Sequence, residues 1–109
     1  MSILSDDDLT TVAGAMLGVL KKGGPDIVAY AESEASKFAA SIETITGLYA
    51  SSQISQDEAT AQLQLQKNAS QAVLTAVEGI TLILATQAIN AGLTAVAAIV
   101  NKAIGFVLL

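Results

Sequence analysis

The region 79–101 is a run of 23 residues without a charged side chain, bounded by Glu78 and Lys102. A window of about 19 residues inside it has a mean hydropathy of roughly 1.9, which is in the range of membrane-spanning helices. Gln87 and Asn90 lie near its middle, however, and each amide would need a hydrogen-bond partner in lipid. The region therefore predicts an apolar helix that is buried either among other helices or in a bilayer.

The clearest helix boundary is the glycine pair and proline at 23–25, which combine a helix stop with a residue suited to the next first turn. Upstream, Ser5 is a candidate N-cap, followed by three aspartates at the positive end of the helix dipole. The lysines at 21–22 lie at its negative end. The aspartates point in different directions on one turn, which argues against a metal site. We therefore expect helices over residues 6–22 and 26–50.

Apolar and small residues recur along the second expected helix with spacings that alternate between three and four. This heptad pattern predicts a seam that packs on a partner helix, with the charged and serine side chains on the opposite, solvated face. Alanines in its first half allow close approach, and larger side chains supply the burial further along. The seam comprises Val28, Ala31, Ala35, Phe38, Ile42, Ile45 and Tyr49.

A polar turn over residues 51–54 precedes the next helix. Ser55 is followed three residues later by Glu58, which is the spacing of a helix capping box. This spacing places the start of a third helix near residue 56. Its first part is rich in glutamine, and Leu63 and Leu65 are its expected apolar anchors.

No proline follows up to the last residue, so the third element is expected to be one helix over 56–109 or two helices with a break near Gly79 or Gly92. At 1.5 Å per residue an unbroken helix would approach roughly 80 Å. The 26–50 helix is too short to shield it all, and the 6–22 helix is expected to fold onto part of the remainder.

The expected fold is all-α: a single domain, residues 1–109, formed as a helical hairpin or bundle of three to four helices with a long apolar C-terminal helix. The C-terminal half is expected to stay partly unshielded, so it should meet other copies of the chain or a bilayer. Gln87 and Asn90, one turn apart, either fix the register of such a contact or form an exposed stripe. Ala88 and Gly92 form a small pair that permits close backbone approach. The residues assigned to self-association or membrane contact are Leu82, Leu84, Gln87, Ala88, Asn90, Gly92, Leu93, Val96, Val100 and Phe106.

Charge and residue types exclude several classes of function. Ten acidic residues stand against five lysines, with no arginine, and the net charge of -5 argues against nucleic acid as a partner. The absence of histidine and cysteine removes the usual general base, the thiolate nucleophile and the soft metal ligands. The 23–25 cluster lacks the lysine and hydroxyl residue of a phosphate-binding loop. We expect no enzyme activity, no cofactor, no metal ion and no small-molecule substrate.

Two hypotheses for function follow. The first is a non-enzymatic structural or assembly protein that self-associates through its apolar C-terminal helical region. The alternative is a membrane-active or pore-forming protein that inserts the 79–101 segment into a bilayer. Both predict a homo-oligomer, and the polar residues inside the segment favour the first. No signal peptide is predicted, because acidic residues follow directly after the first five residues, and the cellular location is left open.

Overall fold

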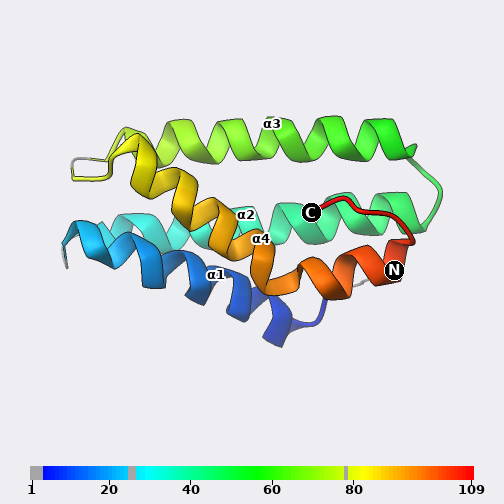
Figure 1. Ribbon diagram of the computed structural model, residues 1–109, viewed down its shortest axis with the longest axis horizontal. Coiled ribbons are helices and arrows are strands. Elements are labelled where there is room, and N and C mark those ends of the chain that lie inside the picture. The colour runs from blue at the N-terminus through cyan, green and yellow to red at the C-terminus, as the bar shows by residue number, and fades with distance from the viewer. Residues whose placement is uncertain (1–3, 25–26, 78) are drawn as a thin grey trace.

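The computed structural model describes residues 4–24, 27–77 and 79–109, with the side chain of Val28 left out. In this part of the chain the secondary structure is entirely helical, which confirms the all-α prediction (Figure 1). The elements are α1 (Asp6–Leu20), the short 3₁₀ helix η1 (Lys21–Gly23), α2 (Val28–Ala50), α3 (Gln56–Thr75) and α4 (Leu82–Ile104). They form a four-helix bundle with the apolar helix α4 at its C-terminal end.

The first helix begins at a capping box and ends earlier than the sequence suggests. The backbone N–H of Asp8 donates to the Ser5 hydroxyl at 3.1 Å, and the Ser5 N–H donates back to the Asp8 carboxylate at 3.0 Å. The helix ends at Leu20, not at residue 22, because the chain tightens into η1 before Gly24 adopts a φ of 127°. The expected start of the second helix at residue 26 lies outside the described residues.

A tight turn joins α2 to α3 and makes the expected hairpin. The turn includes Ser52 with a φ of 62°, and Ser55 then caps α3. The two helices run antiparallel, side by side (Figure 1). Their inner faces are tied by the Ser70 hydroxyl, which donates to a carboxylate oxygen of Glu34 at 2.9 Å.

The third expected element is two helices, with the break at Gly79 and none at Gly92. Gly79 has a φ of 95°, a conformation that side-chain-bearing residues rarely adopt, and Thr81 then caps α4 through its hydroxyl. Gly79 at the break also packs closely against Gly23, because a Cβ at Gly23 would lie 2.8 Å from the Gly79 carbonyl oxygen. The turn after α1 and the turn before α4 therefore support each other at one end of the bundle.

Because of this break, α4 turns back and packs most extensively on α1 (Figure 1). A Cβ placed at Gly92 would lie 2.8 Å from Met16 Cγ and 3.2 Å from Val12 Cγ1, so the two helices approach closely there. Val12, Met16 and Leu20 are fully buried in this contact region. Together with Phe38 and Ile42 of α2 and Leu74 of α3, they are the largest fully buried side chains of the core.

Candidate association surface

The α2 seam lies inside the bundle. Five of its residues are at most 3% exposed, namely Ala31, Ala35, Phe38, Ile42 and Ile45, and Tyr49 is half-buried. The side chain of Val28 lies outside the described residues. Ala39 and Thr46 are buried as well, although they fall off the heptad spacing, because α1 and α3 both pack on α2. The seam is thus used within one copy of the chain and is not free for a second copy.

The expectation that the C-terminal half stays unshielded is wrong for its inner face. Five of the residues assigned to self-association or membrane contact are buried in the chain's own core: Ala88, Gly92, Leu93, Val96 and Val100. Leu84 and Phe106 are half-buried, whereas Leu82, Gln87 and Asn90 are exposed. The physical reason is the break before α4, which lets α1 cover a face that a continuous helix would have left bare.

The outward face of α4 begins with the exposed apolar side chains of Leu82 and Ile83 and then carries polar side chains. Thr86, Gln87, Asn90 and Thr94 are all exposed there. Of the two roles considered for Gln87 and Asn90, the structure places both amides on an exposed stripe, not across a buried seam within the chain. Ala88 and Gly92 do permit close backbone approach, but the helix that approaches is α1.

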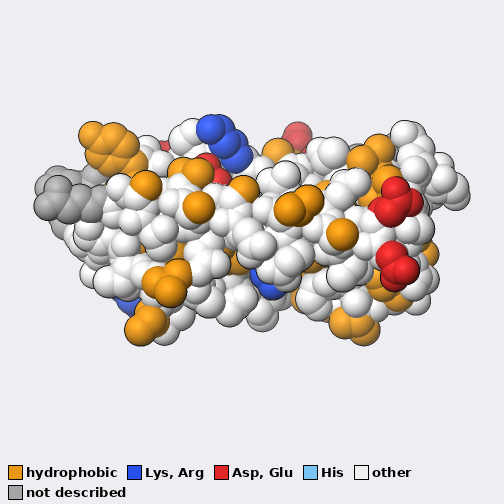
Figure 2. All heavy atoms as spheres, turned by 90° about the horizontal axis from the view of Figure 1, so that it is seen from above, with side chains coloured by type: hydrophobic (Ala, Val, Ile, Leu, Met, Phe, Trp, Pro, Cys, Tyr) orange, Lys and Arg blue, Asp and Glu red, His pale blue; other side chains and the backbone are white. Residues whose placement is uncertain are grey.

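An unpartnered apolar row runs along the outer side of α3, and we call it the α3 crest. Its members are exposed and recur at helical spacing: Ala61, Leu65, Ala69, Ala72, Val73 and Ala76. Figure 2 looks onto α3 and shows hydrophobic side chains spaced along it, with acidic atoms gathered near the end where the helix begins. The two large side chains of the crest, Leu65 and Val73, are 65% and 49% exposed.

The sequence did not separate the two leucines near the start of α3. Leu63 is 6% exposed and belongs to the core, whereas Leu65 is 65% exposed and lies on the crest. Two residues correspond to about 200° around a helix, so both leucines cannot anchor the same face. The sequence did not indicate this difference, because the other crest residues are mostly alanines, which occur on any face of a helix.

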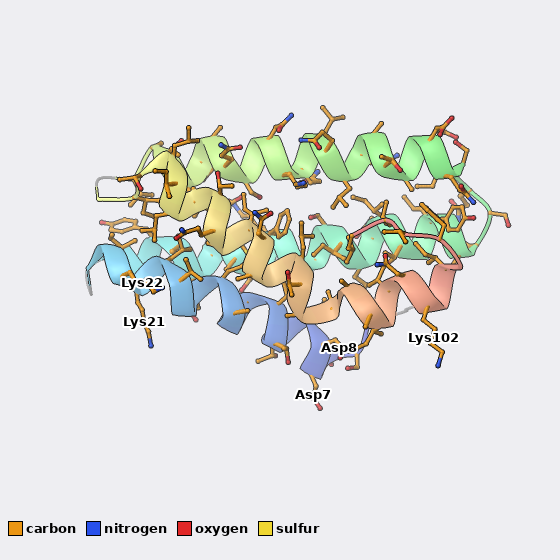
Figure 3. The ribbon with its side chains drawn as sticks, in the orientation of Figure 1. Asp7, Asp8, Lys21, Lys22 and Lys102 are labelled. Carbon is orange, nitrogen blue, oxygen red and sulfur yellow. The ribbon has the colours of Figure 1, made fainter. Side chains whose placement is uncertain are left out.

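The charged side chains form no metal site in the residues described. Figure 3 shows Asp7, Lys21 and Lys102 pointing outward from the bundle. The carboxylate of Asp8 is held by the Ser5 N–H, so it does not converge with its neighbours on an ion. No group of three metal-binding side chains occurs in the part of the chain that the structure describes.

The N-terminus of α3 carries the one clear electrostatic perturbation among the described groups. The Ser55 N–H donates to Glu58 Oε1 at 3.0 Å, and the Glu58 N–H donates to the Ser55 hydroxyl at 3.1 Å. The backbone hydrogen bond from Ser55, followed by the contribution of its side chain, lowers the pKa of Glu58 from its ordinary value of 4.5.

This lowered pKa gives a pH dependence with a definite sign. The ionised Glu58 stabilises the folded state fully above its ordinary pKa of 4.5, and this contribution is lost as the pH falls through the lower folded value. We expect acidification to lower the protection factor of the Ser55 amide, that is, its exchange rate by NMR relative to the unprotected rate at the same pH. Glu58→Gln should remove the pH dependence of this protection factor. An unchanged pH profile in Glu58→Gln would contradict the assignment.

The residues at 105–109 fold back over the bundle. Gly105 has a φ of 83° and reverses the chain after α4. The Phe106 ring then packs edge-on against Tyr49, with ring centroids 5.0 Å apart. Beside this contact, a cavity of about 680 Å³ opens between the α2–α3 turn and the end of α4, with Tyr49, Ile54 and Ile104 in its walls. The apolar C-terminal residues are therefore partly covered by the chain itself.

Comparisons with family models, curated proteins and solved structures found no match to this chain. Among the described helices, α4 is the one long and apolar enough to cross a membrane, with a mean hydropathy of 1.8. Length and composition alone also admit a buried core helix of a water-soluble protein. The packing of α4 on α1 is the feature that bears on the choice between a membrane-spanning helix and a core helix.

Proposed function

We propose that this protein is a non-enzymatic structural or assembly protein whose copies associate through the α3 crest. The observation that carries the proposal is the crest itself: an uncharged apolar row, with Leu65 65% exposed, that no other described part of the chain covers. Exposed apolar rows of this kind mark interaction sites more often than isolated apolar side chains do. The five buried residues of α4 no longer belong to the proposed contact.

Four of the six crest residues pair with one another about a two-fold axis. If two α3 helices pack antiparallel with the axis between residues 68 and 69, Leu65 of each copy faces Ala72 of the other, and Ala61 faces Ala76. The large Leu65 side chain then meets a small one, whereas Ala69 and Val73 face Asn68 and Gln64. The antiparallel arrangement also sets the two helix dipoles in opposition.

The size of the crest sets the expected strength of association. From Ala61 to Ala76 the row is about 22 Å long at 1.5 Å per residue. One helix pair of that length buries less than the roughly 1,200–2,000 Å² of a standard stable interface. We therefore expect a reversible dimer whose population rises with protein concentration.

Membrane insertion of α4 remains the alternative proposal, supported by the hydropathy of that helix. Insertion would require α4 to leave α1 and would expose Val12, Met16 and Leu20, which are fully buried. It would also place Gln87 and Asn90 in lipid without a partner. Association of folded copies needs neither change, so we favour it.

The test is the absolute mass by light scattering on a sizing column, without detergent, over a range of protein concentrations. The wild type should rise above the monomer mass of 11.1 kDa as concentration increases, and Leu65→Asp should stay at it. Ile83→Asp is the matched control, because Ile83 is equally exposed but lies off the crest, and it should behave as the wild type. A monomeric wild type, or a Leu65→Asp variant that still dimerises, would contradict the proposal. Recovery only from membranes would favour insertion.

A further inference from the structure

The 105–109 segment is held by backbone hydrogen bonds and apolar contacts in a site around Tyr49 and Asn101, which we call the seat. The side-chain oxygen of Asn101 accepts the N–H groups of Leu108 at 2.9 Å and of Leu109 at 3.1 Å. Its amide nitrogen donates to the Leu109 carbonyl at 3.4 Å. Phe106 packs on Tyr49, and Leu108 and Leu109 are partly buried against the core. The seat thus recognises a short extended segment with apolar side chains.

One residue decides whether the segment reaches its own seat. Gly105 is in the left-handed region with a φ of 83°, and nothing lies within 4 Å of a Cβ placed there. In a right-handed conformation it would instead continue α4, so that residues 106–109 would follow the helix axis for about 6 Å and leave the seat. The released segment and the vacated seat, with the Tyr49 ring and the Asn101 amide, would then both lack their partners.

We propose that this seat binds the 105–109 segment of a second copy of the chain, so that two copies exchange segments. The occupant is argued from the structure, because the segment is already seen to fill the seat, and a second copy carries a segment of the same sequence that offers the same backbone groups and the same Phe106 ring. Asn101 binds backbone N–H and C=O groups, and these groups are the same whichever copy supplies them. The adjoining cavity of about 680 Å³ leaves room for a chain that arrives from outside.

The tether normally favours the segment of the same copy. A segment joined through one residue has a high effective concentration at its own seat, so exchange is a minor state in the wild type. Domain swapping of this kind conserves the contacts and changes only their connectivity. The inference rests on the proposed self-association and adds a second contact, distinct from the α3 crest.

The test is a complementation experiment in which all chains carry Leu65→Asp, so that the crest contact is disabled. One variant has a damaged seat, Asn101→Ala, and the other has a damaged segment, Phe106→Ala with Leu108→Ala. In the mixture, the intact segment of the first meets the intact, empty seat of the second. We expect native mass spectrometry to show a heterodimer population at least roughly tenfold above either self-dimer, because the tethered competitor is absent.

The second arm uses the hinge itself, in chains with an intact seat and segment. Gly105→Ala disfavours the left-handed conformation and should increase the dimer, whereas Gly105→Asn tolerates it and should match the glycine. Circular dichroism of each variant checks that the bundle is folded. A mixture that stays monomeric, or equal dimer populations in the two hinge variants, would overturn the inference. In that case the response of the wild-type mass to Leu65→Asp still decides the crest proposal separately.

Discussion

Ile42→Asp should be among the most destabilising single substitutions in this chain. Ile42 is 1% exposed at the centre of the α2 seam, and α2 is covered there by other helices. A carboxylate at this position loses its hydration and finds no cation within the apolar core. We expect a loss of about 3–5 kcal/mol, against a total stability of about 5–15 kcal/mol for a domain of this class. Urea or thermal unfolding, followed by circular dichroism, measures the loss.

The matched control is Thr44→Asp, two residues further along the same helix. Thr44 is exposed, and its hydroxyl donates only to the Ala40 carbonyl. An exposed acid there should change stability by no more than about 0.5 kcal/mol. If the two variants melted alike, α2 would not be packed as the structure shows.

Gly92→Leu should be strongly destabilising, for a different reason. A Cβ at Gly92 already lies 2.8 Å from Met16 Cγ and 3.2 Å from Val12 Cγ1, so a larger side chain must push α4 away from α1. Leucine favours a helix over glycine by up to about 1 kcal/mol. Overpacking a close helix contact costs about 1–3 kcal/mol or more, so the net effect is a loss. The midpoint of urea unfolding should fall.

Gly14→Leu gives the contrast on the other helix of the pair. Gly14 lies in α1, and nothing is within 4 Å of a Cβ placed there. The same substitution should therefore stabilise the protein by about 0.5–1 kcal/mol through helix propensity alone. Shifts of the same sign in both variants would show that α4 does not approach α1 at Gly92.

Local signals predicted the helices well because they act within a few residues. Ser5 and Ser55 both cap helices as expected, Ser55 through the predicted capping box, and the cluster at 23–25 lies between α1 and α2 in the sequence. The choice between Gly79 and Gly92 as the break depends instead on distant contacts. Gly79 packs against the turn at Gly23, and Gly92 packs against α1. The residues next to each glycine in the sequence do not indicate these contacts.

The candidate surface was harder to predict, because periodicity identifies an apolar face but not the helix that covers it. Val96 and Val100 look like contact residues in the sequence, yet α1 and α2 already enclose them. Leu65 reads as a core anchor and lies on the outside. The fold of the 105–109 segment depends on the left-handed conformation of Gly105 and on the hydrogen bonds of Asn101, and hydrophobic periodicity predicts neither feature.

The packing of α4 as a core helix is the central claim, and hydrogen exchange in detergent-free buffer tests it most directly. We expect slow exchange for the amides of α4 that face α1, including those of Ala88 and Val96, and fast exchange at Gly79 and Thr81, where the chain turns. Protection running without interruption from α3 into α4 would contradict the claim. So would an α4 that exchanges freely in water and becomes protected only when lipid vesicles are added.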